Sequence, residues 1–401
     1  MRFAQNNEGE FSRMRIAFTN GLVITPNEKV RGGVIAENDR IVRVFEGELP
    51  EACDRVIDVA GSYIAPGFID LHTHGGGGFD YTDATVEAYT TGARVHLKHG
   101  TTAMMPTITT CSHEVLTRSL NAYQTAEHEE NMPMFIGAHL EGPYFSPEQA
   151  GAQDPEYIRN PNRAEYLPLL DEYPMIRRWS VAAELPGALE MGLELSRRGV
   201  VASVGHSDAM YEDMRRAADY GYTLLTHFYS GMAGVRRVNA YRHSGAIESG
   251  YLIDDFAVEI IADGHHLPES LLKLIYKSKG SANICLVTDS VSGAGMPEGW
   301  RSKLCGVDFM IEGGVAKLLD RSAFAGSVTT ANNLIRTMVE IAEVPICEAV
   351  KMLTLTPARI AGVADRMGSL VPGKLANIAV FDREYQVSHV MVSGKMCSEA
   401  L

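Results

Sequence analysis

The stretch Ala65-Pro66-Gly67-Phe68-Ile69-Asp70-Leu71-His72-Thr73-His74 guides the interpretation of the whole chain. Residues 63–71 are mostly apolar, which predicts a buried strand that ends in two histidines one residue apart. Side chains at positions i and i+2 of a strand point to the same side, so His72 and His74 can present both imidazoles to one metal ion. Taken alone, the pair is equally compatible with two histidines packed in a core.

The composition indicates a globular protein and limits its partners. Of 401 residues, 45% are hydrophobic and the formal net charge is −14, which argues against nucleic acid as a partner. The six cysteines show no C-x-x-C spacing and are expected to be reduced, as in an intracellular protein. No run of 18 apolar residues and no signal-peptide segment occurs, so we expect a cytoplasmic protein without membrane association.

Two β-rich ends flank a long middle segment. Alternating segments at 16–58 and again at 376–392 predict a small β-sandwich domain, built from residues 14–64 and 367–401. Residues 1–13 are expected to be a flexible N-terminal tail.

The middle, residues 65–366, alternates apolar strand-like runs with helical segments, which is the pattern of βα units around a parallel sheet. Eight runs are expected to be strands: 63–71, 102–107, 134–139, 179–183, 200–204, 223–226, 257–262 and 284–288. Eight is the strand number of the closed α/β barrel. We therefore predict an α/β fold with a (β/α)8, TIM-like barrel.

Six of the eight predicted strands end in residues that can bind a metal or move a proton. In such barrels the carboxyl ends of the strands form the functional face. A set of histidines with a carboxylate suits a first-row divalent ion that keeps a position open for water. The residues at these ends are His72 and His74, then His139 and Glu141, then His206, then His227, then Asp263, His265 and His266, and finally Asp289.

These motifs resemble the amidohydrolase superfamily. Within it, the segments 139–144, 205–209, 226–229 and 286–289 are similar to the N-acetylglucosamine-6-phosphate deacetylases. The resemblance implies a metal-dependent hydrolase with one or two divalent ions of zinc, iron, manganese or cobalt. It also implies a set of site residues: metal binding by Glu141, His206 and His227, a second ion at His72 and His74 bridged by Glu141, Asp289 as metal ligand and catalytic base, and His266 at the substrate carbonyl.

The resemblance further implies a phosphorylated amino-sugar substrate. Ser230 and Gly231 stand where the family usually has an asparagine and a small residue, and both are expected to contact the substrate. Arg242 matches an arginine that reaches into the pocket of the neighbouring subunit, so a homodimer is implied. An arginine offers a phosphate a fixed positive charge.

Several alternatives remain open at this stage. The substrate can be N-acetylgalactosamine 6-phosphate or another N-acyl compound. Cyclic amidohydrolases of the hydantoinase and dihydroorotase type share the H-x-H pair, but they carry a carboxylated lysine after strand four, and 181–186 contains no lysine. A barrel that has become a structural or regulatory protein is the non-enzymatic alternative.

Two further features serve as controls. His96 and His99 lie three residues apart on a predicted outer helix, and we expect them to be surface or packing residues far from the strand ends. The run Gly75–Gly78 lacks the lysine and serine or threonine of a P-loop, so we expect a flexible loop beside the site.

Overall fold

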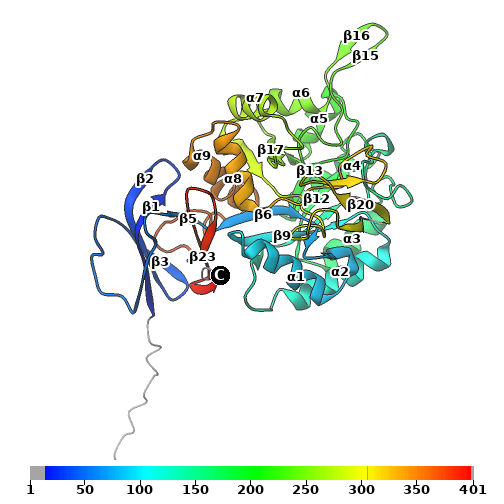
Figure 1. Cartoon of the computed structure of the whole chain (residues 1–401). Coiled ribbons are helices and arrows are strands. Elements are labelled where there is room, and N and C mark those ends of the chain that lie inside the picture. Colours follow the sequence, from blue (N-terminus) through cyan, green and yellow to red (C-terminus); the bar gives the residue numbers. More distant parts are fainter. Residues whose placement is uncertain (1–13, 305, 399–401) are drawn as a thin grey trace, which may run out of the picture.

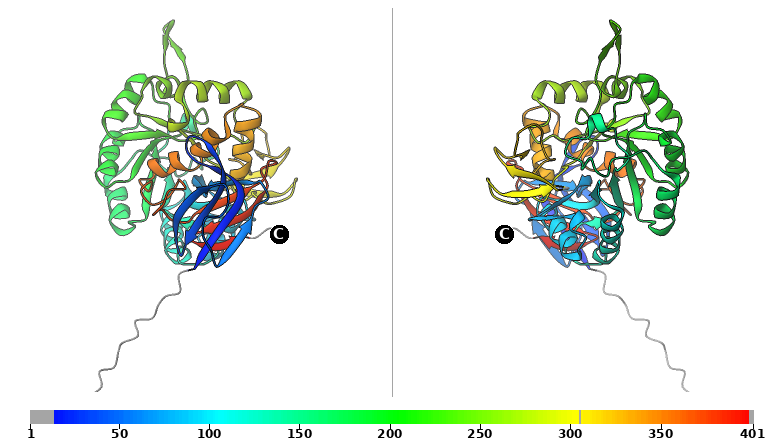
Figure 2. Two further views of the ribbon diagram at one scale, coloured as in Figure 1. Left: turned by 90° about the vertical axis from the view of Figure 1, so that its left-hand side faces the viewer. Right: turned by 90° about the vertical axis from the view of Figure 1, so that its right-hand side faces the viewer.

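The computed structural model describes residues 14–304 and 306–398, so the predicted tail and Cys305 lie outside the described residues. A barrel makes up most of the molecule, and a smaller sheet lies against it (Figures 1 and 2). The barrel strands are β6 (Phe68–Thr73), β9 (Thr101–Thr109), β11 (Ala138–Glu141), β12 (Ile176–Val181), β13 (Val201–Val204), β14 (Tyr222–Leu225), β17 (Ala257–Ile260) and β18 (Ile284–Leu286).

These eight strands confirm the predicted barrel. Each pairs in parallel with the next, from β6 and β9 through to β17 and β18, and the short β10 (Met134–Phe135) also pairs with β9. The chain after β18 returns to β6, because Asp289 N donates to His72 O at 2.8 Å and Ser290 bridges Thr73. The last predicted site residue therefore lies beside the first.

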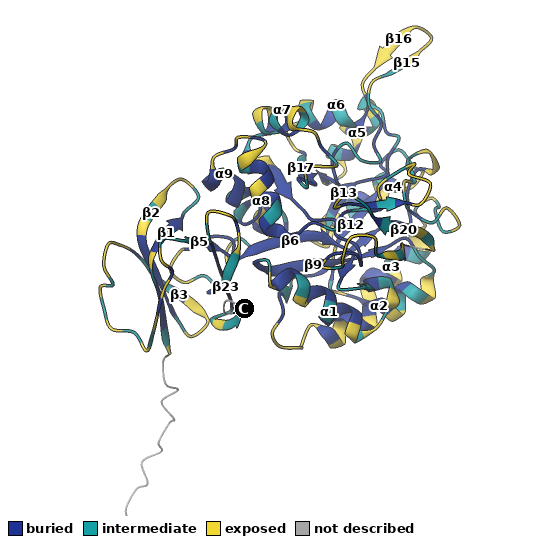
Figure 3. Cartoon of the chain, viewed as in Figure 1, coloured by how far each residue is buried: buried dark blue, intermediate teal, exposed yellow. Residues whose placement is uncertain are grey.

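Helices cover the outside of the barrel and turn their buried faces toward it (Figure 3). Polar caps start several of them: Thr85 accepts from Ala88 N before α1, and Ser112 accepts from Val115 N before α2, satisfying donors that the helix leaves unpaired. Their bounds are α1 (Val86–Leu97), α2 (His113–Ala126), α3 (Arg163–Glu172), α4 (Ala188–Arg197), α5 (Tyr211–Asp219), α6 (Ala246–Leu252), α7 (Glu269–Lys279), α8 (Ala331–Glu340), α9 (Ile346–Met352) and α10 (Leu355–Ile360).

The small sheet joins both ends of the described chain. Its strands run in the order β24, β23, β22, β5, β1, β2, β3, with β4 also paired to β1. Buried residues such as Phe18, Val34 and Ile378 form its core. The strands are β1 (Arg15–Ile24), β2 (Lys29–Glu37), β3 (Arg40–Glu46), β4 (Arg55–Asp58), β5 (Tyr63–Pro66), β22 (Ile378–Phe381), β23 (Val387–Val392) and β24 (Lys395–Ser398).

The predicted single strand 63–71 is in fact two strands in different sheets. β5 pairs with β1 and β22 in the small sheet, whereas β6 begins the barrel. The change occurs at Pro66-Gly67, where proline brings no backbone donor and Gly67 N donates to Asn377 O at 2.8 Å. A Cβ at Gly67 would lie 2.1 Å from Thr102 Oγ1, so glycine lets the two sheets share one continuous segment.

Smaller elements decorate the barrel. β15 (Arg236–Val238) and β16 (Tyr241–His243) form a hairpin that projects from the barrel (Figure 1). The other short elements are β7 (Gly75–Gly76), β8 (Phe79–Asp80), β19 (Arg301–Leu304), β20 (Val307–Ile311), β21 (Ala316–Leu318), η1 (Tyr81–Asp83), η2 (Pro147–Gln149) and η3 (Ser281–Asn283). None of the helices in residues 14–304 and 306–398 has the length and apolarity needed to cross a bilayer.

Candidate active site

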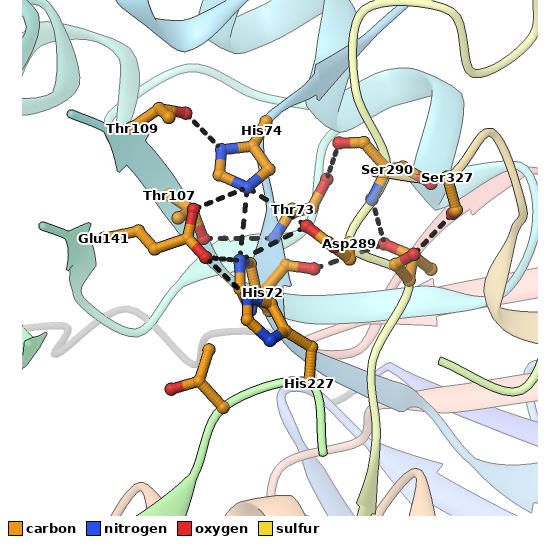
Figure 4. Close-up of polar contacts among 12 residues, drawn as sticks. His72, Thr73, His74, Thr107, Thr109, Glu141, His227, Asp289, Ser290 and Ser327 are labelled. Atoms are coloured by element: carbon orange, nitrogen blue, oxygen red, sulfur yellow. Dashed lines mark hydrogen bonds and ion pairs between the residues drawn. The ribbon is translucent and has the colours of Figure 1, made fainter. Parts of the chain in front are cut away.

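Six predicted metal-binding side chains meet at the carboxyl end of the barrel, and Figure 4 shows most of them pointing toward one another. Five of them form two groups that share one carboxylate. His72, His74 and Glu141 make up the first group, and Glu141, His206 and His227 the second; in each group the ligand atoms lie within 4.8 Å of one another. Glu141 therefore stands where a bridging ligand is required.

Distances show how Glu141 faces four imidazoles. Its Oε1 atom lies 3.0 Å from Nε2 of His227 and 3.4 Å from Nε2 of both His206 and His72. Its Oε2 atom lies 3.4 Å from Nε2 of His74. Asp289 Oδ1 completes the cluster at 3.3 Å from His72 Nε2 and 3.1 Å from His74 Nε2.

The donor set fits a divalent cation. His72 Nε2 and His74 Nε2 face each other at 3.2 Å, and His206 Nε2 and His227 Nε2 do so at 3.1 Å. Two facing imidazole nitrogens are compatible only if a proton or a cation lies between or beside their lone pairs. Nitrogen and carboxylate ligands of this kind suit zinc, iron, manganese or cobalt.

The pKa shifts of these side chains also favour a cation in the site. Burial opposes the charged form of His72, but the carboxylates of Asp289 and Glu141 outweigh burial and raise its pKa to about 10. Burial likewise opposes the charged forms of Glu141 and Asp289, yet the neighbouring histidines hold the pKa of both carboxyls below the ordinary value. The carboxylates thus remain ionised and call for positive charge, and binding of a divalent ion would release protons from the imidazoles.

Three of these residues have an unusual backbone conformation. φ is +46° at His206, +31° at His227 and +47° at Asp289, a left-handed region that costs non-glycine residues energy. Hydrogen bonds hold these positions: Asp289 N donates to His72 O, and His227 N donates to Glu259 Oε2 at 3.3 Å. Sharp turns directly after the strands therefore aim the three side chains into the site.

A cavity of about 210 Å³ opens over the metal-binding groups. Three of the four predicted substrate-binding residues, His266, Ser230 and Gly231, line it together with all the predicted metal ligands except His72. Arg242 does not line it, because it is exposed on strand β16 of the projecting hairpin. The cavity wall also contains Leu304, Ala323 and Phe324 from the segment that follows β18.

Residues 63–397 match the amidohydrolase family. The chain belongs to the amidohydrolase family.

Relatives within the family match almost the whole chain. An N-acetylglucosamine-6-phosphate deacetylase of Haemophilus influenzae is 33% identical over 95% of this chain and 99% of that protein. An N-acetylgalactosamine-6-phosphate deacetylase of Escherichia coli O157:H7 is 33% identical over 84% of this chain and 88% of that protein. A Mycobacterium smegmatis N-acetyl-D-glucosamine-6-phosphate deacetylase mutant, solved with N-acetyl-D-glucosamine-6-phosphate, has a TM-score of 0.88 and 29% identity, covering 96% of this chain and 100% of that chain.

Several residues of this amidohydrolase site were not found by sequence reasoning. Gln153 Nε2 donates to Glu141 Oε2 at 2.9 Å. Asp263 was found at a strand end but was given no role, and its Oδ2 lies 2.8 Å from His266 Nδ1. Arg178 and Glu259 form an ion pair inside the barrel. A charge within an apolar strand run is the signal that could have revealed Glu259, whereas Gln153 lies in a loop without a pattern.

His96 and the run Gly75–Gly78 each differ in part from expectation. His96 is a packing residue, as predicted, but it lies close to a strand end: its Nε2 is buried 2.9 Å from Gly75 O and 3.1 Å from Thr73 Oγ1. Gly75–Gly78 is part of the hydrogen-bonded hairpin β7–β8 rather than a flexible loop. Its glycines are needed for shape, since a Cβ at Gly75 would lie 2.1 Å from Phe79 O.

We predict that Glu141→Ala empties the amidohydrolase metal site, because it removes the carboxylate that faces all four imidazoles. Elemental analysis of the purified variant should find little bound metal. Glu165→Ala is the control, since this carboxylate contacts Tyr144 and Arg159 and no metal-binding residue. Full metal content in Glu141→Ala would contradict the assignment.

Proposed function

We propose that the protein hydrolyses the acetamide of N-acetyl-D-glucosamine 6-phosphate to D-glucosamine 6-phosphate and acetate. The observation that carries the proposal is one cavity lined by Glu141, His206, His227, Asp289 and His266, in a chain that matches named deacetylases along nearly their entire length. A candidate metal-binding wall with a carboxylate beside it suits metal-assisted amide hydrolysis.

Amide hydrolysis needs an activated water and a proton donor for the departing amine. A divalent ion, when bound, lowers the pKa of water toward neutrality and polarises the acyl oxygen. Asp289 is proposed to accept the proton of the attacking water and to pass it to the amine nitrogen. Its depressed pKa keeps the carboxyl ionised and ready to accept.

His266 is proposed to contact the acyl oxygen. Its Nδ1 faces the carboxylate of Asp263 at 2.8 Å, so its other ring nitrogen is left for the substrate. An imidazole that donates from Nδ1 can also donate from Nε2 only when it is protonated. Donors placed at a developing oxyanion are typically worth about 3 to 4 kcal/mol.

The metal content is proposed to be one or two ions per chain, of zinc, iron, manganese or cobalt. Both ligand groups are complete in the described residues. Because they share Glu141, two ions would be held by one bridging carboxylate.

We further propose a cytoplasmic homodimer in which Arg242 holds the phosphate in the partner's pocket. Arg242 is exposed on the β15–β16 hairpin and does not line its own cavity. Tyr241 and Val238, on the same hairpin, are 75% and 49% exposed. Exposed apolar side chains around an arginine suit a protein–protein contact.

N-acetyl-D-galactosamine 6-phosphate is the second candidate substrate, because one of the relatives acts by name on that epimer. An acetate-release assay tests the function directly. We expect N-acetyl-D-glucosamine 6-phosphate to be cleaved faster than its galactosamine epimer, and both faster than unphosphorylated N-acetylglucosamine. Faster cleavage of the galactosamine epimer would make N-acetyl-D-galactosamine 6-phosphate the preferred substrate. If none of the three sugars released acetate, the proposal would be refuted.

Asp289→Asn should retain metal and lose turnover, because an amide cannot accept the proton of water. General-base removal typically lowers the rate by about 100- to 10,000-fold. The measurement is kcat with the phosphorylated sugar, together with metal content. Near-wild-type kcat in this variant would mean that another group is the base.

Arg242→Ala should raise KM for the phosphorylated substrate by about ten- to a hundredfold, since a charge-assisted phosphate contact contributes about 1.5 to 3 kcal/mol. The unphosphorylated sugar should be nearly unaffected. Arg237→Ala, the residue opposite Arg242 in the hairpin, is the matched control.

Mixing Arg242→Ala protein with Asp289→Asn protein extends this test to the dimer. A mixed dimer would contain one pocket with an intact Asp289 and an intact arginine from the partner. We expect activity to recover after subunit exchange. Exchange without recovery would place Arg242 outside the partner's pocket.

A further inference from the structure

An ion pair crosses the interior of the barrel beneath the metal-binding residues. Arg178 on β12 and Glu259 on β17 are both 0% exposed. The guanidinium group donates to both carboxylate oxygens: Nη1 to Oε1, and Nη2 to Oε2 at 2.8 Å. Burying two charges is costly unless each is paired and hydrogen-bonded, so the partners of this pair indicate what it does.

Every donor of Arg178 has an acceptor. Besides Glu259, Nη1 donates to Leu71 O at 3.0 Å, Nη2 to Thr226 Oγ1 at 3.1 Å, and Nε to Ser203 Oγ at 3.0 Å. These acceptors belong to strands β6 and β13 and to the end of β14. Leu71 and Thr226 directly precede His72 and His227 in the chain, so the guanidinium group contacts the residue next to one ligand of each group, through the backbone of Leu71 and the side chain of Thr226.

Glu259 contacts a ligand side chain directly. Its Oε2 lies 3.4 Å from His72 Nδ1. A carboxylate only accepts hydrogen bonds, so the proton of a neutral His72 belongs on Nδ1. The lone pair is then on Nε2, the nitrogen that faces Glu141 and Asp289.

At Nδ1, none of the other three histidine ligands has a carboxylate partner. His74 Nδ1 lies 2.7 Å from the hydroxyl of Thr109, and His206 Nδ1 lies 2.8 Å from the backbone carbonyl of Gln149. His227 Nδ1 is buried without a hydrogen-bond partner in the described structure. His72 alone among the four has a carboxylate behind it, and such a partner increases the basicity of a metal-binding imidazole.

We propose that Glu259, paired with Arg178, is a positioning residue that orients His72 and strengthens metal binding by the group of His72, His74 and Glu141. The pair would therefore control occupancy of the second metal position rather than the chemistry itself. This inference rests on the metal dependence in the proposed function. Neither Arg178 nor Glu259 lines the cavity.

The test titrates metal-free protein with zinc(II) alone against a competing chelator and resolves the binding steps. His72→Asn first identifies the step that belongs to the His72 group. Glu259→Gln is then expected to weaken that step by about 10- to 100-fold, the usual effect of altering the partner of a metal ligand. A change confined to the other step would overturn the proposal.

Glu259→Gln leaves Arg178 without its counter-charge and can fail to fold. The double variant Arg178→Met/Glu259→Gln removes both charges, so no uncompensated charge is buried. Circular dichroism checks its fold, and its zinc step at the His72 group should be weakened as well. Wild-type zinc affinity in a folded double variant would overturn the proposal.

A control separates this effect from a general loss of stability. Glu184→Gln alters a mostly buried carboxylate that accepts from Ser207 Oγ and Asp208 N but contacts no metal-binding side chain. Its zinc steps should match those of the wild type, and an equal weakening would show that the effect of Glu259 is unspecific.

The readout also separates this proposal from the proposed function. Zinc binding is measured without substrate. A wild-type protein that binds zinc but releases no acetate would therefore refute the deacetylase assignment, while the zinc affinities of wild type and variants could still be compared. If His72→Asn bound zinc as the wild type does, the inference about Glu259 would be overturned and the deacetylase assignment would be unaffected.

Discussion

The need to balance negative charge inside the barrel governs the architecture of the site. Three carboxylates, of Glu141, Glu259 and Asp289, are buried close together, and the pKa of each is held below its ordinary value despite burial. Among the described side chains at the site, Arg178 supplies one permanent positive charge and pairs with Glu259. The charges of Glu141 and Asp289 remain, and a divalent cation matches them. The fold therefore holds a cluster whose negative charge a divalent cation would balance.

The sequence was sufficient for the barrel and for the grouping of most candidate site residues, because both follow simple periodicities. Apolar runs mark the strands, and the carboxyl ends of parallel strands share one face. His72 and Asp289 could be assigned to one site although they lie at opposite ends of the barrel sequence, because closure of the barrel brings β18 back to β6. The resemblance to a known family supplied the roles of Glu141 and His266, which remain proposals.

What the sequence did not reveal depends on local geometry or on long-range pairing. The positive φ angles at His206 and His227 arise from turns that have no recognisable sequence pattern. Arg178 and Glu259 lie on strands that are not adjacent, so no spacing along the chain predicts their contact. The division of 63–71 between two sheets was also missed, because its apolar pattern continues across Pro66-Gly67 while its hydrogen-bond partners change.

The division of the segment at Pro66-Gly67 has a consequence for folding during synthesis on the ribosome. Strand β5, which leads directly into the strand of His72, lies between β1 and the distant β22. During synthesis β1 emerges early, but Ile378–Phe381 emerges only after the whole barrel. One edge of β5 therefore stays open through most of translation, and open edges invite pairing with other chains. The open edge of β5 is thus protected from aggregation only when the carboxyl-terminal strands pair with it, and completion of the barrel does not protect it.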